Sequence, residues 1–331
     1  MLLLAASVSA QDLGLPSSVQ NARYATDAYP GFDSEKNFAP ERKSPKWFAF
    51  INGPDCGDAA TQMSHCRELE AEGKWSKAAK QYDALVREWP TSSEAPEAQR
   101  AYAQILEDRE DDLEGAMAEY RYLLDFFSQS CDYNAIADKM YELAGKMREE
   151  GKTIMFFRFK NTVEVRHAFE AAVLRAPGAK WAPAAMLEIA DLREEEGRDD
   201  EAVKVYENLR NIHYGTPEAA ESLVREAYAR MRILRECGYN RDRSRDTLSF
   251  LEMALKSCKE GENFSAISGF IAETKSLIEG EAFRAAAFYD SRMRTRRSAI
   301  NALEKFLAEY PSSSHAAEAK ARLEQLKGEE K

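Results

Sequence analysis

The sequence predicts an all-α fold, an α-solenoid of about six stacked helix hairpins. Three observations lead to this fold class. From about Asp58 onward, apolar residues recur at spacings of three and four, as they do on one face of a helix. A short pattern of small and apolar residues recurs six times over the same stretch. Because one hairpin cannot bury its own apolar stripe, neighbouring hairpins must stack on it.

The recurring pattern is a small residue, a large apolar residue four positions later and a second apolar residue seven positions after the first. These positions share one face of a helix, and the small residue lets the paired helix approach closely. The four clearest copies supply the predicted repeat core: Ala78, Tyr82 and Leu85; Ala116, Tyr120 and Leu123; Ala202, Tyr206 and Leu209; Ala299, Leu303 and Phe306. Two looser copies are Val165, Phe169 and Ala172, and Thr247, Leu251 and Ala254.

Each copy is expected to form the second helix of a hairpin. In three copies a proline twelve residues after the first position ends the helix: Pro90, Pro177 and Pro311. The turns before three of these helices are predicted at Gly73-Lys74, Asp111-Asp112 and Gly197-Arg198. The first helices of the hairpins are clearest at residues 181–196 and 281–291.

The chain before the solenoid has a different character. Residues 1–10 form an apolar run that ends in Val8-Ser9-Ala10, which predicts a signal peptide; since it lacks a basic start, we interpret it as truncated. The alternative is a cytosolic chain whose start happens to be apolar. Residues 11–57 hold five prolines and predict an extended arm, followed by the solenoid at 58–327 and a tail at 328–331. We expect the aromatic residues 47–51 to pack on the first helices, the alternative being a partner-binding patch.

Composition excludes several classes of function. The 331 residues carry a net charge of −11, which gives no general attraction for nucleic acid or anionic lipid. No cysteine follows the apolar start, so no lipid anchor at a processed N-terminal cysteine is expected. The five cysteines are odd in number and include no CxxC motif. Cys237 and Cys258 should lie about 24 Å apart at opposite ends of one hairpin, so we expect no disulfide between them.

We find no motif for catalysis, a cofactor or a small-molecule substrate. The four histidines lie far apart, and no HExxH, GxSxG or phosphate-binding loop occurs. Two acidic runs, Glu194 to Glu196 with Asp199-Asp200 and Glu107 to Asp112, could suggest a cation site, but we interpret them as solvated turns. An enzyme with a solenoid accessory region would need a catalytic module, and the arm before Asp58 is too short for one. A non-enzymatic protein is therefore predicted.

Two sets of residues resemble known families. Gly73, Trp75, Ala78, Tyr82, Leu85 and Pro90 stand in the register of the tetratricopeptide repeat family, although the copies here lie 37 to 52 residues apart instead of about 34. This departure implies elongated helices or inserted turns. Residues 286–292, followed by Ala299-Ile300-Asn301, Phe306-Leu307 and Tyr310 to Ser313, resemble the last repeat of the outer-membrane β-barrel assembly lipoproteins, the D subunit of that machinery.

The second resemblance implies a periplasmic protein-binding scaffold that takes part in outer membrane protein assembly. Its implied partners are barrel-assembly subunits or unfolded outer-membrane protein segments, with outer-membrane association through those partners. Family members often carry an arginine where this chain has Ala302, which argues against docking by that contact. The alternative is a periplasmic coordinator of the Tol or cell-wall division type, which shares the last-repeat pattern; the proline-rich arm argues against the N-terminal coiled coil that such proteins often carry.

Two surfaces are candidates for binding these partners. The first helices of stacked hairpins line a concave groove that suits an extended or helical peptide. The candidate groove residues are Met63, Arg67, Glu70, Ala101, Ile105, Asp108, Arg109, Asp191 and Glu194. The candidate docking residues near the last repeat are Arg292, Arg294, Arg296 and Arg297, the alternative being a solvated turn.

Overall fold

The computed structural model describes residues 53–150, 152–154, 157–159, 161–258, 261–292 and 296–328. The predicted signal peptide, nearly all of the arm with its aromatic residues 47–51, and residues 329–331 of the tail lie outside this part of the chain. The described residues form thirteen helices and one two-stranded β-hairpin. The chain divides into two compact units, residues 1–218 and 219–331.

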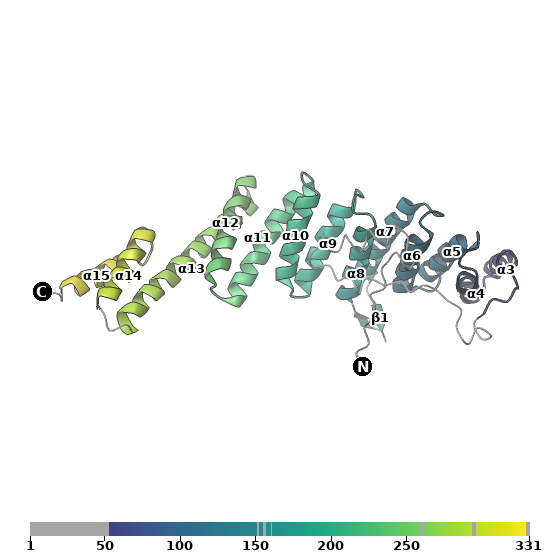
Figure 1. The fold of residues 1–331 in the computed structure, drawn as a ribbon, viewed down its shortest axis with the longest axis horizontal. Helices are drawn as coiled ribbons and strands as arrows, with labels where there is room; N and C mark the ends of the chain where they lie inside the picture. Colours follow the sequence, from purple (N-terminus) through teal and green to yellow (C-terminus); the bar gives the residue numbers. More distant parts are fainter. Residues whose placement is uncertain are drawn as a thin grey trace, which may run out of the picture. The chain divides into compact units, whose positions relative to one another are not determined.

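The first unit contains four helix hairpins that follow one another in chain order (Figure 1). Each helix packs on the one before it and the one after it. The hairpins are α3 (Ala59–Ala71) with α4 (Trp75–Glu88), α5 (Ala95–Asp108) with α6 (Leu113–Phe127), α7 (Tyr133–Glu150) with α8 (Thr162–Arg175), and α9 (Ala182–Glu195) with α10 (Asp199–Ile212).

The second unit adds two hairpins and a closing helix. The hairpins are α11 (Pro217–Cys237) with α12 (Arg241–Ser257), and α13 (Glu262–Arg292) with α14 (Arg296–Glu309), followed by α15 (Ala316–Gly328). The described residues thus form six hairpins, and the predicted all-α solenoid is confirmed. Helix α15 packs on the preceding hairpin with Ala319 and Leu326, and its other face is exposed.

Local signals fix where the helices begin. Asp58, Asp112 and Asn240 each accept a hydrogen bond from the backbone N–H three residues later, at 2.9 to 3.0 Å, and so cap α3, α6 and α12. The predicted turns are also found. Gly73 and Gly197 have φ angles of 73° and 71°, in the left-handed region that glycine adopts without strain.

Two features account for the two longest intervals between copies of the pattern. Strands β1 (Lys152–Ile154) and β2 (Phe157–Phe159) pair antiparallel between α7 and α8. Helix α13 has 31 residues, so the first helix of the last hairpin begins at Glu262 and the range 281–291 expected from the sequence was too short. The apolar stripe continues backward through Ile278 and Ile267, and no proline interrupts it.

All twelve residues of the predicted repeat core are buried, each with no more than 3% of its surface exposed. The two looser copies are buried as well. Complete burial of four alanines shows why a small residue stands first in the pattern. A larger side chain there would push the paired helices apart.

Three repeat tyrosines share a hydrogen bond that the sequence pattern does not reveal. Each hydroxyl donates to a carboxylate near the end of the first helix of the same hairpin. Tyr82 donates to Glu70 at 3.0 Å, Tyr120 to Glu107 at 3.1 Å and Tyr206 to Glu194 at 2.8 Å. Burial, together with these carboxylates, raises the pKa of Tyr82 and of Tyr120, so both hydroxyls stay protonated donors.

Three acidic residues that we interpreted as part of solvated turns are buried. The Glu107 side chain is 2% exposed and lies 2.9 Å from Nζ of Lys139 and 2.5 Å from Nζ of Lys146, both on α7. The Glu196 side chain is 7% exposed and accepts a hydrogen bond from Nε of Arg166 on α8 at 2.8 Å. Asp199, at the start of α10, is 9% exposed. The interpretation as solvated turns was wrong for these residues, and for Glu107 and Glu196 the reason is that a neighbouring helix supplies the partner.

Further buried ion pairs connect successive hairpins of the first unit. Arg175 on α8 donates two hydrogen bonds from Nη2 to the carboxylate of Asp125 on α6, at 2.9 and 2.8 Å. Glu170 on α8 accepts one hydrogen bond from Arg166 at 2.8 Å and another from Arg193 of α9 at 3.2 Å. Because a buried charge is costly unless it is paired, these contacts hold neighbouring hairpins in one arrangement.

The tyrosine–carboxylate bond can be tested by a Tyr206→Phe substitution. We expect the free energy of unfolding to fall by about 1 kcal/mol, since the hydroxyl leaves two carboxylates that it contacts, Asp191 and Glu194. Chemical denaturation measures the change. The matched control is Tyr214→Phe, because Tyr214 is 92% exposed; equal losses in both variants would contradict a stabilising role for the bond.

Glu107 should make stability depend on pH. Burial alone would raise the pKa of Glu107, but hydrogen bonds from Lys146 and Lys139 outweigh burial and hold the pKa below its ordinary value of 4.5. A carboxylate whose pKa is lower in the folded chain than in the unfolded chain stabilises the fold at pH values above its ordinary pKa. This stabilisation is lost as the pH falls through the pKa of the folded chain. We expect the free energy of unfolding of Glu107→Gln to be about 2 kcal/mol lower than that of the wild type near neutral pH. Below about pH 5 its free energy of unfolding should depend less on pH. Denaturation from pH 7 to 3, with the exposed Glu88→Gln as control, measures both effects; parallel curves for the wild type and Glu107→Gln would contradict the assignment.

Candidate binding groove in the second unit

The structure distributes the nine candidate groove residues among several roles. Met63 and Ile105 are 4% and 3% exposed and belong to the core, so they do not line a groove. Their apolar side chains pack between helices because they belong to the buried stripes of α3 and α5. Ala101 packs half-buried against the same core.

The charged and polar members of that set are largely engaged within the chain. Arg67 pairs with Glu97 at 2.7 Å, and the guanidinium of Arg109 lies 4.3 Å from the ring centre of Trp75. Glu70, Asp191 and Glu194 accept the tyrosine hydroxyls described above. Asp108 is exposed near the end of α5.

The candidate docking arginines lie around the turn between α13 and α14. Arg292 is the last residue of α13, and Arg296 and Arg297 belong to the first turn of α14. Arg297 is exposed and Arg296 is half-buried, whereas Arg294 lies outside the described residues. Neither Arg296 nor Arg297 is among the residues that line the groove described below.

One hollow of the first unit has a volume of about 760 Å³ and lies between α5, α6 and α7. Two of its charged residues already have ion-pair partners: Glu97 pairs with Arg67, and Lys139 pairs with Glu107. Its residues include Pro96, Arg100, Tyr120, Cys131, Asp132 and Ile136. The mixed and mostly satisfied charges give this hollow no clear preference for a ligand.

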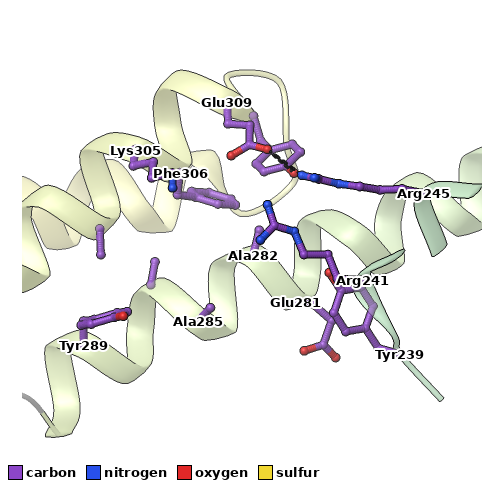
Figure 2. A pocket seen from close by; sticks show the side chains of 13 residues that line it. Tyr239, Arg241, Arg245, Glu281, Ala282, Ala285, Tyr289, Lys305, Phe306 and Glu309 are labelled. Atoms are coloured by element: carbon purple, nitrogen blue, oxygen red, sulfur yellow. Dashed lines mark hydrogen bonds and ion pairs between the residues drawn. The ribbon is translucent and has the colours of Figure 1, made fainter. Parts of the chain in front are cut away.

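A groove of about 370 Å³ lies in the second unit, between α13, α14 and the residues around the start of α12 (Figure 2). Ala282, Ala285 and Ala286 on α13 are small and leave the space open, while Phe306 of α14, 3% exposed, contributes the apolar wall opposite them. The remaining lining residues are Tyr239, Arg241, Arg245, Glu281, Tyr289, Ala302, Lys305, Glu309 and Tyr310.

Aromatic packing fixes the wall of the groove. The ring of Phe306 lies 5.5 Å from that of Phe283 and 5.6 Å from that of Tyr310, measured between ring centres. These distances are typical of favourable aromatic pairs. Tyr289, 42% exposed, lies farther along α13 on the other side of Ala285 from Ala282.

The acidic residues of the groove have partners within the second unit. Nη2 of Arg245 donates to Oε1 of Glu309 at 3.2 Å, and the Tyr310 hydroxyl donates to the same oxygen at 2.9 Å. Burial and this hydrogen bond raise the pKa of Tyr310, which keeps the hydroxyl a donor. Glu281 pairs with Arg284 one turn along α13.

Two cations of the groove remain available. Arg241 and Lys305 are exposed, and neither has a hydrogen-bond or ion-pair partner among the described residues. Figure 2 shows them on different elements, with Arg241 extending from the start of α12 toward the groove and Lys305 beside Phe306 on α14. The groove therefore offers positive charge beside an apolar wall, in a chain whose net charge is −11.

Sequence reasoning named part of this groove without recognising it. Ala286, Phe306 and Tyr310 belong to the last-repeat pattern, whereas Arg241, Arg245 and Lys305 were not singled out. The spacing of four between Arg241 and Arg245 places both on one face of α12 and was an available signal. Nothing in the sequence placed that face beside α14.

Comparison with known proteins agrees with the repeat architecture. Residues 184–213 match the family model described as tetratricopeptide repeat, and this range covers most of α9 and all of α10. No curated protein matches the chain. Across the described residues, no helix combines the length and the apolar character needed to cross a membrane.

Several solved structures are similar to the chain at low identity. Pseudomonas aeruginosa PilF is 14% identical, with 80% of this chain and 97% of that chain covered and a TM-score of 0.28. A tetratricopeptide repeat protein from Parabacteroides merdae is 10% identical, with 81% and 98% covered and a TM-score of 0.27. The C-terminal part of a TPR repeat-containing protein from Cytophaga hutchinsonii is 13% identical, with 91% and 98% covered and a TM-score of 0.30. TM-scores this low support no conclusion about function. The family match shows a tetratricopeptide repeat at residues 184–213. Solenoids of this kind typically bind other proteins.

Proposed function

We propose that this chain is a protein-binding scaffold of the cell envelope that takes part in outer membrane protein assembly. In this proposal the groove of the second unit binds an acidic segment of a partner protein. The observation that carries it is the pair of available cations, Arg241 and Lys305, beside the apolar wall formed by Phe306. The role in outer membrane assembly rests on the last-repeat resemblance, and Ala286, Phe306 and Tyr310 of that repeat line the same groove.

The chemistry of the groove suits a protein segment. Phe306 and the alanines of α13 can bury an apolar side chain, and Tyr239 and Tyr289 add aromatic surface of the kind enriched in protein interfaces. A carboxylate that reaches Arg241 or Lys305 forms a charge-assisted hydrogen bond without displacing an existing partner. Arg245 and Glu309 already neutralise each other and keep the edge of the groove in place.

The proposed action is binding, without catalysis. The described residues contain no group of three or more side chains suited to hold a metal ion. The proposed partners are subunits of the barrel-assembly machinery or unfolded outer-membrane protein segments, and membrane association would come through them. The proposed location is the periplasm, and cell fractionation tests it: recovery with the envelope or periplasmic fraction is expected, and a purely cytosolic location would contradict the proposal.

Reversing the two available charges tests the groove. We expect the double variant Arg241→Glu with Lys305→Glu to weaken binding of the periplasmic region of the barrel-forming subunit from the same organism by at least about tenfold, since the two introduced glutamates would repel the acidic segment. Titration calorimetry at physiological salt measures the dissociation constant. Wild-type affinity should also fall as salt rises, because exposed charges are screened.

The matched control reverses two exposed lysines outside the groove, Lys256→Glu with Lys320→Glu, and changes the net charge equally. Its affinity should stay within about twofold of wild type. Equal weakening in both double variants would assign the effect to net charge and contradict the groove. Absence of binding by the wild type, or preferential binding of a Tol or cell-wall partner, would contradict the assembly role.

A further inference from the structure

We propose that Cys56 and Cys66 form a disulfide that fastens the segment preceding the first helix to that helix. Cys56 lies two residues before Asp58, which caps α3, and Cys66 lies within α3. Both are free thiols in the structure. The proposal is independent of the binding groove, which belongs to the other unit.

The segment before α3 folds back along the first hairpin. The backbone N–H of Asp55 donates to Oε1 of Gln81 on α4 at 3.1 Å. The carboxylate of Asp55 lies 3.3 Å from Nε2 of His65, the residue immediately before Cys66. These two contacts hold the segment beside the part of α3 that contains Cys66.

A single side-chain amide contacts both cysteines. Oε1 of Gln62 accepts a hydrogen bond from the backbone N–H of Cys56 at 2.9 Å, and Nε2 of Gln62 lies 3.8 Å from Sγ of Cys66. Gln62 itself is fully buried and also bonds Gln81 at 2.6 Å, so its position is fixed. The fixed amide therefore holds the backbone of one cysteine near the sulfur of the other. In this proposal the Cys56 side chain rotates until the two sulfurs are about 2.0 Å apart, and the irregular segment 53–57 adjusts with it.

The two thiols differ in exposure, and this difference determines which of them reacts first. Cys56 is partly exposed, whereas Cys66 is fully buried. Burial raises the pKa of the Cys66 thiol to about 12, so the Cys56 thiolate attacks the external disulfide first. With oxidised glutathione as the oxidant, this attack forms a mixed disulfide and releases one glutathione. Cys66 then loses its proton and displaces the second glutathione, so two protein thiols are oxidised and one glutathione disulfide is reduced to two thiols.

The other cysteines serve as internal controls. Cys131 lies in the turn between α6 and α7 and lines the hollow of the first unit. Cys237 ends α11 and Cys258 follows α12, so the length of α12 separates them by about 25 Å. This distance is far beyond the reach of a disulfide.

The experiment oxidises the reduced full-length chain with oxidised glutathione under native conditions. After denaturation, free thiols are counted by their mass shift with a maleimide reagent, and the bridge is located by peptide mass spectrometry. We expect three free thiols, a Cys56–Cys66 bridge and a melting temperature raised by about 5 °C. The Cys56→Ser variant should form no bridge and show no increase in melting temperature on oxidation. The Cys237→Ser variant should form the bridge and show the increase.

Three results would each overturn the proposal. These are five free thiols after oxidation, a glutathione adduct that persists on Cys56 while Cys66 stays reduced, and a bridge between a different pair. Because Cys56 lies outside the core, the Cys56→Ser variant should fold; the circular dichroism spectrum of its reduced form should match that of the reduced wild type.

Discussion

The structure depends on the close approach of paired helices, which four of the hairpins achieve at one small residue. Ala78, Ala116, Ala202 and Ala299 are fully or almost fully buried, and the large residue four positions later fills the space beside the contact. A hairpin still leaves apolar surface uncovered, so each is stable only with a neighbouring hairpin or with a further helix such as α15. Stacking and capping follow from this one constraint.

Buried charge is the second feature that follows from stacking. Glu107 and Asp125 would be costly to bury in an isolated hairpin, but the next hairpin supplies Lys139 and Lys146 to the first and Arg175 to the second. Removing one partner of such a pair costs far more than removing both, because the remaining charge stays buried. These pairs therefore make the first unit depend on the correct order and register of its hairpins.

The sequence predicts what is encoded locally and misses what depends on distant partners. The repeat stripes and the turns at Gly73 and Gly197 follow from spacing and backbone preference, and the structure contains them. The full length of α13 was missed because its first half carries no copy of the pattern. The strands were missed because each has only three residues, too few to show the alternation typical of a strand. The burial of Glu107 could not be foreseen, since Lys139 and Lys146 come from another hairpin. The groove was missed for the same reason: Arg241 and Lys305 lie far apart in the chain and meet only in the folded unit.

The central claim is that the groove of the second unit is the surface that docks a partner. Site-specific photo-crosslinking in living cells tests it most directly, with a photoreactive amino acid placed at Ala285, an exposed residue that lines the groove, and at Glu252, an exposed residue that does not. We expect position 285 alone to crosslink to an acidic segment of a barrel-assembly subunit or of an outer-membrane protein. The same adducts from both positions, or none from position 285, would contradict it.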